Sequence, residues 1–133
     1  MRKLCLDTNF LIALLRGNKE AVEKAKEYDS TRAEVSTTSV NAFEVYFGAF
    51  RSREAEKNVK QADSLLSSIK ILKLNLEASR KAGEILSELM HKGTPIDLRD
   101  ALIAGITLTN GYTLVTRNIE HFKRIIGLSI ETW

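Results

Sequence analysis

Short apolar runs alternate with longer segments of helical periodicity along this chain. Five runs have the length and the apolar or β-branched composition of buried strands. They are Lys3–Leu6, Glu34–Thr37, Ile71–Leu74, Tyr112–Thr116 and Leu128–Ile130. Helix-starting and helix-stopping residues lie between them, such as Asn18 before one helical segment and Gly111 after another. The pattern therefore predicts strands that are separated by helices.

Helices are expected where apolar side chains recur every three or four residues. These segments are Phe10–Leu15, Glu20–Tyr28, a helix from Ser39 or Asn41 to Phe50, Arg51–Ser68, Leu76–His91, Leu98–Thr109 and Ile119–Arg124. Strands that alternate with helices form a parallel sheet covered on both faces, which is the α/β class. We expect a mostly parallel sheet of about five strands in a single domain over residues 1–133.

One predicted helix carries an unusual number of aromatic residues. Val40, Phe43, Phe47 and Phe50 recur at spacings of three, four and three, which predicts a face that packs on the core. Glu44 lies about 100° around the helix from Phe43. We therefore expect the Glu44 carboxylate at the border between core and solvent.

The composition excludes several classes of protein. The chain has 133 residues, 44% of them hydrophobic, so it can bury a core without cross-links. One cysteine and two histidines exclude a disulfide framework and a metal site built from Cys and His. No segment approaches the ~20 consecutive apolar residues of a membrane span, so we expect no membrane contact and a cytoplasmic location. A net charge of +3 is too mild to identify an anionic partner.

Acidic and amide side chains follow the predicted strands or begin helices. Asp7 comes directly after the first strand, Asn118 follows the fourth, and Asp97 and Asp100 lie three residues apart at a helix start. Ligands of open parallel sheets bind at the carboxyl ends of the strands, so these side chains can face one another. Asp7 and Asp97 are also favourable helix caps worth ~1 kcal/mol, and the helix dipole favours an acid at Asp100 in the first turn, so each residue alone is more often structural.

Convergence of these carboxylates would change that interpretation. Two carboxylates ~4 Å apart repel by about 4 kcal/mol at an effective dielectric of 20, which capping does not offset for several pairs. A cation would then have to lie among them. Oxygen ligands without cysteine or histidine indicate Mg²⁺ or Mn²⁺.

Four segments in order resemble the motifs of PIN-domain ribonucleases, and in particular VapC-type toxins of toxin–antitoxin pairs. The segments are Leu6-Asp7-Thr8-Asn9, Asn41-Ala42-Phe43-Glu44-Val45 with Gly48, Gly93-Thr94-Pro95-Ile96 followed by Asp100-Ala101-Leu102-Ile103-Ala104-Gly105, and Leu114-Val115-Thr116-Arg117-Asn118 with Phe122. The resemblance covers the whole chain. It implies a three-layer α/β/α fold, a Mg²⁺ or Mn²⁺ site, and hydrolysis of RNA phosphodiesters by metal-activated water.

The resemblance also implies roles for individual residues. Asp7, Glu44 and Asp100 match the first three acids of the family, which makes them the expected metal ligands and catalytic residues. Asn118 occupies the position of the fourth acid and is expected to take part in catalysis, although its amide carries no negative charge for a second metal ion. The supporting positions are Thr8, Asn9 and Thr116, which are expected to orient the acids or the water, and Asp97, an extra carboxylate or a cap.

Partners are likewise implied by the resemblance: an RNA substrate, a cognate VapB-type antitoxin and a second copy of the chain in a homodimer. Tyr46 and Phe50 are expected to line a groove for an antitoxin helix or a second subunit, because one core face needs fewer aromatic residues. The basic residues Arg51, Arg53, Lys57 and Lys60 either follow a phosphate backbone or form a solvated helix face.

Two other functions stay open at the level of sequence. One is a catalytically weak RNA-binding module with the same fold, which Asn118 favours and the three retained acids disfavour. The other is a different Mg²⁺-dependent hydrolase of phosphoryl groups. Phosphatases of the haloacid-dehalogenase type have a second aspartate two residues after the first, where this chain has Asn9, and receiver domains need an acidic pair that the first strand does not supply.

Overall fold

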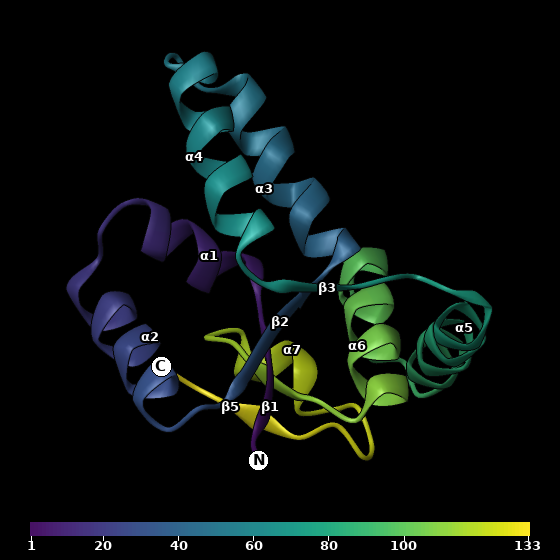
Figure 1. The fold of residues 1–133 in the computed structure, drawn as a ribbon. Coiled ribbons are helices and arrows are strands. Elements are labelled where there is room, and N and C mark those ends of the chain that lie inside the picture. The colour runs from purple at the N-terminus through teal and green to yellow at the C-terminus, as the bar shows by residue number, and fades with distance from the viewer.

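A five-stranded parallel sheet forms the centre of the computed structural model, which describes residues 1–133 (Figure 1). The strands are β1 (Lys3–Leu6), β2 (Glu34–Thr38), β3 (Lys70–Leu72), β4 (Thr113–Val115) and β5 (Ile130–Glu131). Their order across the sheet is β3-β2-β1-β4-β5, and every neighbouring pair is parallel. The sequence-based prediction of a parallel α/β sheet with about five strands is confirmed.

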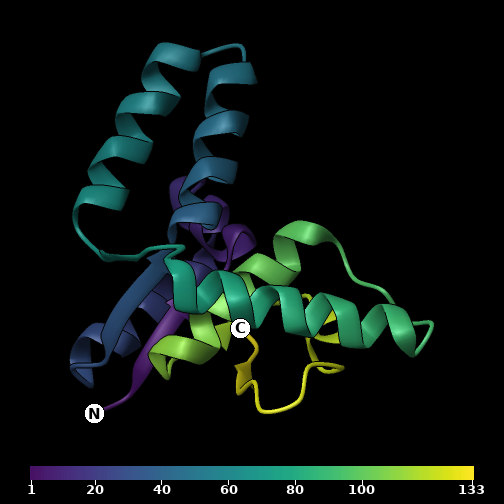
Figure 2. The same ribbon diagram turned by 90° about the vertical axis from the view of Figure 1, so that its right-hand side faces the viewer.

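Seven helices cover the two faces of this sheet. They are α1 (Thr8–Leu15), α2 (Lys19–Ser30), α3 (Ser39–Arg51), α4 (Ala55–Ser67), α5 (Leu76–His91), α6 (Leu98–Asn110) and α7 (Ile119–Phe122). None of these helices is both long and apolar enough to cross a membrane. Figures 1 and 2 show α5 and α6 packed together on one side of the sheet, away from α1 and α2.

The central strand β1 contributes to both hydrophobic cores because side chains alternate between the faces of a strand. Leu4 and Leu6 pack with Phe10 and Tyr28 in the core on the α1 and α2 side. Cys5 points to the opposite core, which α5, α6 and α7 supply. Burial raises the pKa of the Cys5 thiol to about 12, so this cysteine acts as a small core side chain.

Helices α3 and α4 form a hairpin that extends away from the sheet (Figures 1 and 2). The prediction of a core-facing aromatic face on α3 is wrong. Phe43, Phe47 and Phe50 are 59%, 52% and 65% exposed, whereas Asn41 and Val45 are the buried residues of this helix. The hairpin extends beyond the sheet, where no further element covers this face of α3. The periodicity therefore identified residues that share a helix face, but not whether another element packs on that face.

Helices α5 and α6 approach each other closely at Gly105. A Cβ atom at this position would lie 2.7 Å from the carbonyl oxygen of Ala78 and 2.8 Å from the backbone nitrogen of Ala82. Only glycine fits this contact, because both neighbours are backbone atoms of α5. The contact sets the crossing of the two helices and thereby the position of the N-terminus of α6, where Asp100 lies.

The remaining differences from the sequence prediction lie at element ends. The strand predicted at Ile71–Leu74 is β3 (Lys70–Leu72), and the strand predicted at Leu128–Ile130 is β5 (Ile130–Glu131). Helix α4 begins at Ala55 rather than Arg51 because α3 continues through Arg51. These shifts of up to four residues leave the order of elements unchanged.

Candidate active site

Asp7 is a buried carboxylate at the carboxyl end of the central strand. Its Oδ1 accepts hydrogen bonds from the Thr8 backbone nitrogen (2.9 Å) and from Asn41 Nδ2 (3.0 Å). Its Oδ2 accepts a hydrogen bond from Thr116 Oγ1 (2.6 Å), at the end of the neighbouring strand β4. All three donors are neutral. Asp7 is only 7% exposed and has no lysine or arginine partner.

Glu44 reaches the same edge of the sheet from α3. Thr8 Oγ1 donates a hydrogen bond to Glu44 Oε1 at 2.6 Å, and Asn41 Nδ2 donates to Thr8 Oγ1 at 2.9 Å. The other carboxylate oxygen, Oε2, lies 3.2 Å from the Arg99 guanidinium at the start of α6. Hydrogen bonds through Thr8 and Asn41 therefore connect Glu44 to Asp7.

Asp100 lies in the first turn of α6 and is largely shielded from solvent. Burial raises the pKa of its carboxyl, the contact with His121 lowers it, and the negative charge of Asp7 raises it. His121 Nδ1 lies 3.3 Å from Asp100 Oδ2 and 2.8 Å from Asn118 Nδ2. Asp100 and Asn118 therefore meet through His121, and the charges of Asp100 and Asp7 act on each other.

Two of the predicted supporting residues lie at the border of this group of acids: Asn9 contacts none of them, and Asp97 raises the pKa of Asp100 through its negative charge. Asp97 caps α6, because its Oδ1 accepts a hydrogen bond from the Arg99 backbone nitrogen at 2.8 Å. The Arg99 side chain also lies 3.2 Å from Asp97, and these two interactions hold the pKa of Asp97 below its ordinary value. Asn9 is exposed and makes no side-chain hydrogen bond. Both residues lie at the edge of the site.

The donor set at Asp7 and Asp100 fits a divalent cation. Both carboxylates are shielded and their charges repel. The His121 contact offsets part of this repulsion at Asp100, and neither acid forms an ion pair with a lysine or arginine. No three Asp, Glu, His or Cys side chains are gathered at one point. Glu44 contacts Thr8 and Arg99. The structure thus brings Asp7 and Asp100 together, with Glu44 close to Asp7. That these three residues bind a metal ion stays a prediction.

Asn41 and Arg99 organise the site but were not singled out from the sequence. Asn41 is fully buried, and its amide contacts Asp7, Thr8 and Thr38, the last by a 2.7 Å hydrogen bond from Thr38 Oγ1. The sequence did hold a signal for Asn41, because this polar residue lies about one helical turn before Glu44 on α3. Arg99 had no such signal, because its contact with Glu44 joins residues 55 positions apart.

Replacing Asn41 with alanine is expected to destabilise the protein by roughly 1–3 kcal/mol, because Asp7 and Thr8 lose buried hydrogen-bond donors. Asn41→Asp is expected to cost more, since it places a second carboxylate within hydrogen-bond distance of Asp7. Urea unfolding measures both effects. Asn58→Ala is a matched control, because Asn58 makes one part-buried hydrogen bond to Ser52. A loss no larger than that of the control would contradict the organising role of Asn41.

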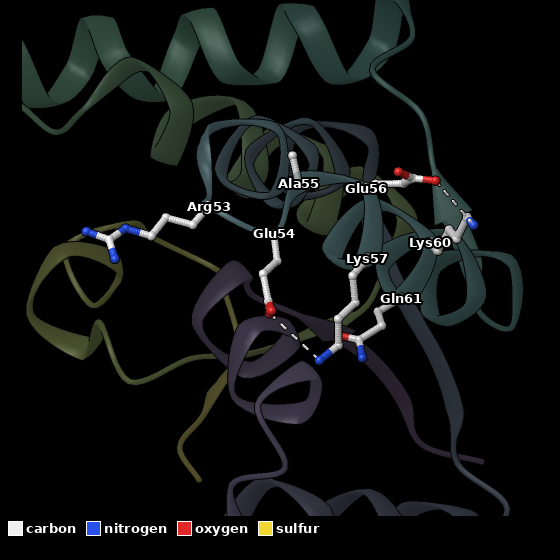
Figure 3. Close-up of a pocket in the computed structure, with 7 residues that line it drawn as sticks. All are labelled: Arg53, Glu54, Ala55, Glu56, Lys57, Lys60 and Gln61. Carbon is white, nitrogen blue, oxygen red and sulfur yellow. Dashed lines mark ion pairs between the residues drawn. The ribbon is translucent and has the colours of Figure 1, made fainter.

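An open pocket of about 580 Å³ lies away from these acids, at the tip of the α3–α4 hairpin (Figure 3). It is lined by Arg53, Glu54, Ala55, Glu56, Lys57, Lys60 and Gln61. Lys57 pairs with Glu54 and Lys60 with Glu56, so much of the local positive charge is offset. Arg53 points away from both ion pairs in Figure 3. The lining is charged, exposed and without a buried polar group, which gives no basis for a catalytic site there.

Comparison with known proteins identifies the family of the chain. The sequence matches the PIN domain over residues 4–128. It is 32% identical over 133 residues to the tRNA(fMet)-specific endonuclease VapC of Salmonella typhimurium, covering 100% of this chain and 99% of that relative. The chain belongs to the VapC family of PIN-domain proteins. Ribonuclease VapC2 of Rickettsia felis is 30% identical over 128 residues, which cover 96% of each protein.

Solved structures of VapC complexes have the same fold as this PIN domain. The crystal structure of VapBC2 from Rickettsia felis bound to a promoter DNA fragment matches with a TM-score of 0.90, 28% identity and coverage of 98% of each chain. The structure of DNA-bound VapBC from Salmonella typhimurium matches with a TM-score of 0.89 and 32% identity, over 100% of this chain and 99% of that one. The three-layer PIN fold is thereby confirmed.

Proposed function

We propose that this VapC-family PIN domain is a Mg²⁺- or Mn²⁺-dependent endoribonuclease of the cytoplasm and the toxin of a toxin–antitoxin pair. The observation that carries the proposal is the pair of shielded carboxylates, Asp7 and Asp100, whose charges repel and which form no ion pair with a lysine or arginine, His121 being the one basic side chain in contact with Asp100. Relatives named endonuclease or ribonuclease VapC, 30–32% identical over nearly the whole chain, support RNA as the substrate.

Asp7 and Asp100 would hold the ion, with Glu44 as a third ligand from α3. A bound divalent ion polarises a phosphodiester and lowers the pKa of water, which supplies the nucleophile for hydrolysis. The chain itself orients the ligands. Asn41 and Thr116 hold the two oxygens of Asp7, and Thr8 holds Glu44.

A cleavage assay with and without chelator tests the reaction. Purified protein is incubated with a mixed RNA pool in EDTA, and Mg²⁺, Mn²⁺ or Ca²⁺ is then added in excess. We expect no cleavage in EDTA and recovery with Mg²⁺ or Mn²⁺, because the donor set is made of hard oxygen ligands. Cleavage that persists in EDTA would contradict metal dependence. A protein that binds RNA and Mg²⁺ without cutting would support the weak RNA-binding alternative.

The partner proposals rest on the solved relatives, which are VapBC complexes. We expect a VapB-type antitoxin to form a complex with this chain and to stop its cleavage of RNA. Adding the antitoxin to the cleavage assay measures this inhibition, and analytical ultracentrifugation of the free chain measures the expected homodimer.

Asn118→Asp is expected to raise the affinity for Mn²⁺ several-fold. The new carboxylate adds negative charge beside Asp100, which Asn118 already reaches through His121. Isothermal titration with Mn²⁺ measures the affinity. Asn118→Ala is the control, because it removes the contact with His121 without adding charge. Equal affinities of the two variants would show that position 118 does not reach the ion.

A further inference from the structure

Three phenylalanines on one face of α3 form an exposed apolar surface, here called the aromatic strip: Phe43, Phe47 and Phe50. Each is more than half exposed, and no other element of the chain covers them. The rings of Phe43 and Phe47 are stacked, with centroids 5.9 Å apart and planes 16° from parallel. A contiguous apolar surface of this kind marks an interaction site in a folded monomer.

The aromatic strip borders the acidic site along the same helix. Phe43 directly precedes Glu44, and Phe47 follows Glu44 by three residues, so the Cα atoms of both lie within one helical turn, about 5 Å along the axis, of the Glu44 Cα atom. Glu44 in turn connects through Thr8 to Asp7. A molecule held by the acids can therefore contact the aromatic strip without leaving the surface.

At the end of the aromatic strip away from Glu44 the charges are positive and have no carboxylate partner. The Arg51 guanidinium lies 5.5 Å from the centroid of the Phe47 ring. The arginines with carboxylate partners are Arg2, Arg99 and Arg117, so neither Arg51 nor Arg53 has one. In Figure 3 Arg53 also points away from the ion pairs of the hairpin tip.

Aromatic rings next to unpaired arginines are the combination that binds single-stranded nucleic acid. Bases stack on the exposed rings irrespective of sequence, and guanidinium groups contact the phosphates. A purely apolar partner helix would use the rings but would leave Arg51 and Arg53 without anions. The arginine charges together with the exposed rings thus favour a nucleic acid, which has phosphates and flat bases, over a protein helix.

We propose that the aromatic strip is the docking surface for unpaired nucleotides of the RNA substrate, with bases stacked on Phe43 and Phe47 and phosphates beside Arg51 and Arg53. The inference rests on the proposed ribonuclease function and adds to it the surface that holds the bases of the substrate. In a duplex the bases stack on each other and cannot reach the rings.

Fluorescence anisotropy in EDTA tests this surface with a fluorescein-labelled 12-nucleotide RNA of mixed sequence, free or annealed to its complement. Phe47→Ala and Phe43→Ala are each expected to weaken binding of the single strand about tenfold, because one stacked base is lost. Phe47→Tyr keeps the ring and is expected to stay within about twofold of wild type. Phe47→Leu keeps apolar area without a ring and is expected to weaken binding like alanine.

Leu76→Ala is the matched control, since Leu76 is an exposed apolar residue on α5, and it is expected to leave binding unchanged. Binding of the duplex is expected to change less than twofold in all variants. In cleavage assays the phenylalanine variants are expected to raise KM more than they lower kcat. Circular dichroism melts check that each variant is folded.

Three other outcomes would each contradict one claim. If the wild type cleaves RNA and the Phe43 and Phe47 variants bind the single strand as tightly as it does, the aromatic strip is not an RNA surface. If RNA affinity stays unchanged while Phe47→Ala loses its complex with the antitoxin or its homodimer, the aromatic strip is a protein-docking surface and the inference is wrong. A wild-type protein that neither binds nor cleaves RNA would contradict the proposed function itself.

Discussion

Asp7→Asn and Asp100→Asn are each expected to lower the rate of RNA cleavage at least about a hundredfold while the protein stays folded. Residues that only orient metal ligands already contribute 10–100-fold in metal affinity or activity, so removal of a ligand charge should exceed that range. The side-chain amide introduced by Asp7→Asn can keep most of the local hydrogen bonds, because its oxygen can accept from Thr8 and Asn41 and its nitrogen can donate to Thr116 Oγ1.

Stability and activity should separate in these variants. Burial raises the pKa of Asp100, which means that its ionised form destabilises the metal-free protein at neutral pH. That destabilisation is absent when the carboxyl is protonated at low pH, and Asp100→Asn resembles the protonated form. We therefore expect thermal melts in EDTA to give Asp100→Asn a Tm at or above that of wild type.

Asp97→Asn is the matched control for both acids. Asparagine caps a helix as well as aspartate does, and the Asp97 side chain pairs with Arg99. Its charge raises the pKa of Asp100 less than the charge of Asp7 does. The cleavage rate of Asp97→Asn is expected to stay within a few-fold of wild type. An inactive Asp97→Asn, or an active Asp7→Asn, would contradict the assignment of the metal to the Asp7 and Asp100 pair.

Gly105→Ala is expected to lower the free energy of unfolding by about 2 kcal/mol or more. The added Cβ would meet the backbone of α5 at 2.7 and 2.8 Å, so α5 and α6 must move apart. This strain outweighs the ~1 kcal/mol that alanine contributes to a helix interior. Urea denaturation gives the free energy, and the Tm should fall by roughly 5–10 °C.

Gly83→Ala on α5 is the control for helix propensity. No atom lies within 4 Å of a Cβ at Gly83, so this variant is expected to gain about 0.5–1 kcal/mol. Two alanine variants of equal stability would show that the helices tolerate a wider crossing. Because α6 carries Asp100, we also expect Gly105→Ala to lose activity that Gly83→Ala keeps.

The order of elements and the edge of the sheet that carries the acids were predictable from the sequence. Strand and helix patterns alternate clearly, Asp7 comes directly after the first predicted strand, and Thr116 ends the fourth. These local signals suffice because parallel strands place their carboxyl ends together.

The aromatic face of α3 could not be assigned correctly from the sequence. Helical spacing identifies residues that share a face, and Phe43 and Phe47 do share one. Whether that face is covered depends on the direction of the α3–α4 hairpin, which no local pattern encodes. Asn41 and Val45, on the other side of the helix, occupy the buried positions instead.

The pairing of the central strand has a consequence for synthesis of the chain on the ribosome. Strand β1 can pair with β2 once about 30 more residues have been synthesised. Its other edge stays unpaired until β4, Thr113 to Val115, has been synthesised. Open strand edges are the places where chains associate wrongly. Thr116 and Asp100 also come late, so a nascent chain carries Asp7 and Glu44 long before the acidic site can close. The nuclease therefore stays incomplete until nearly all of it has been translated.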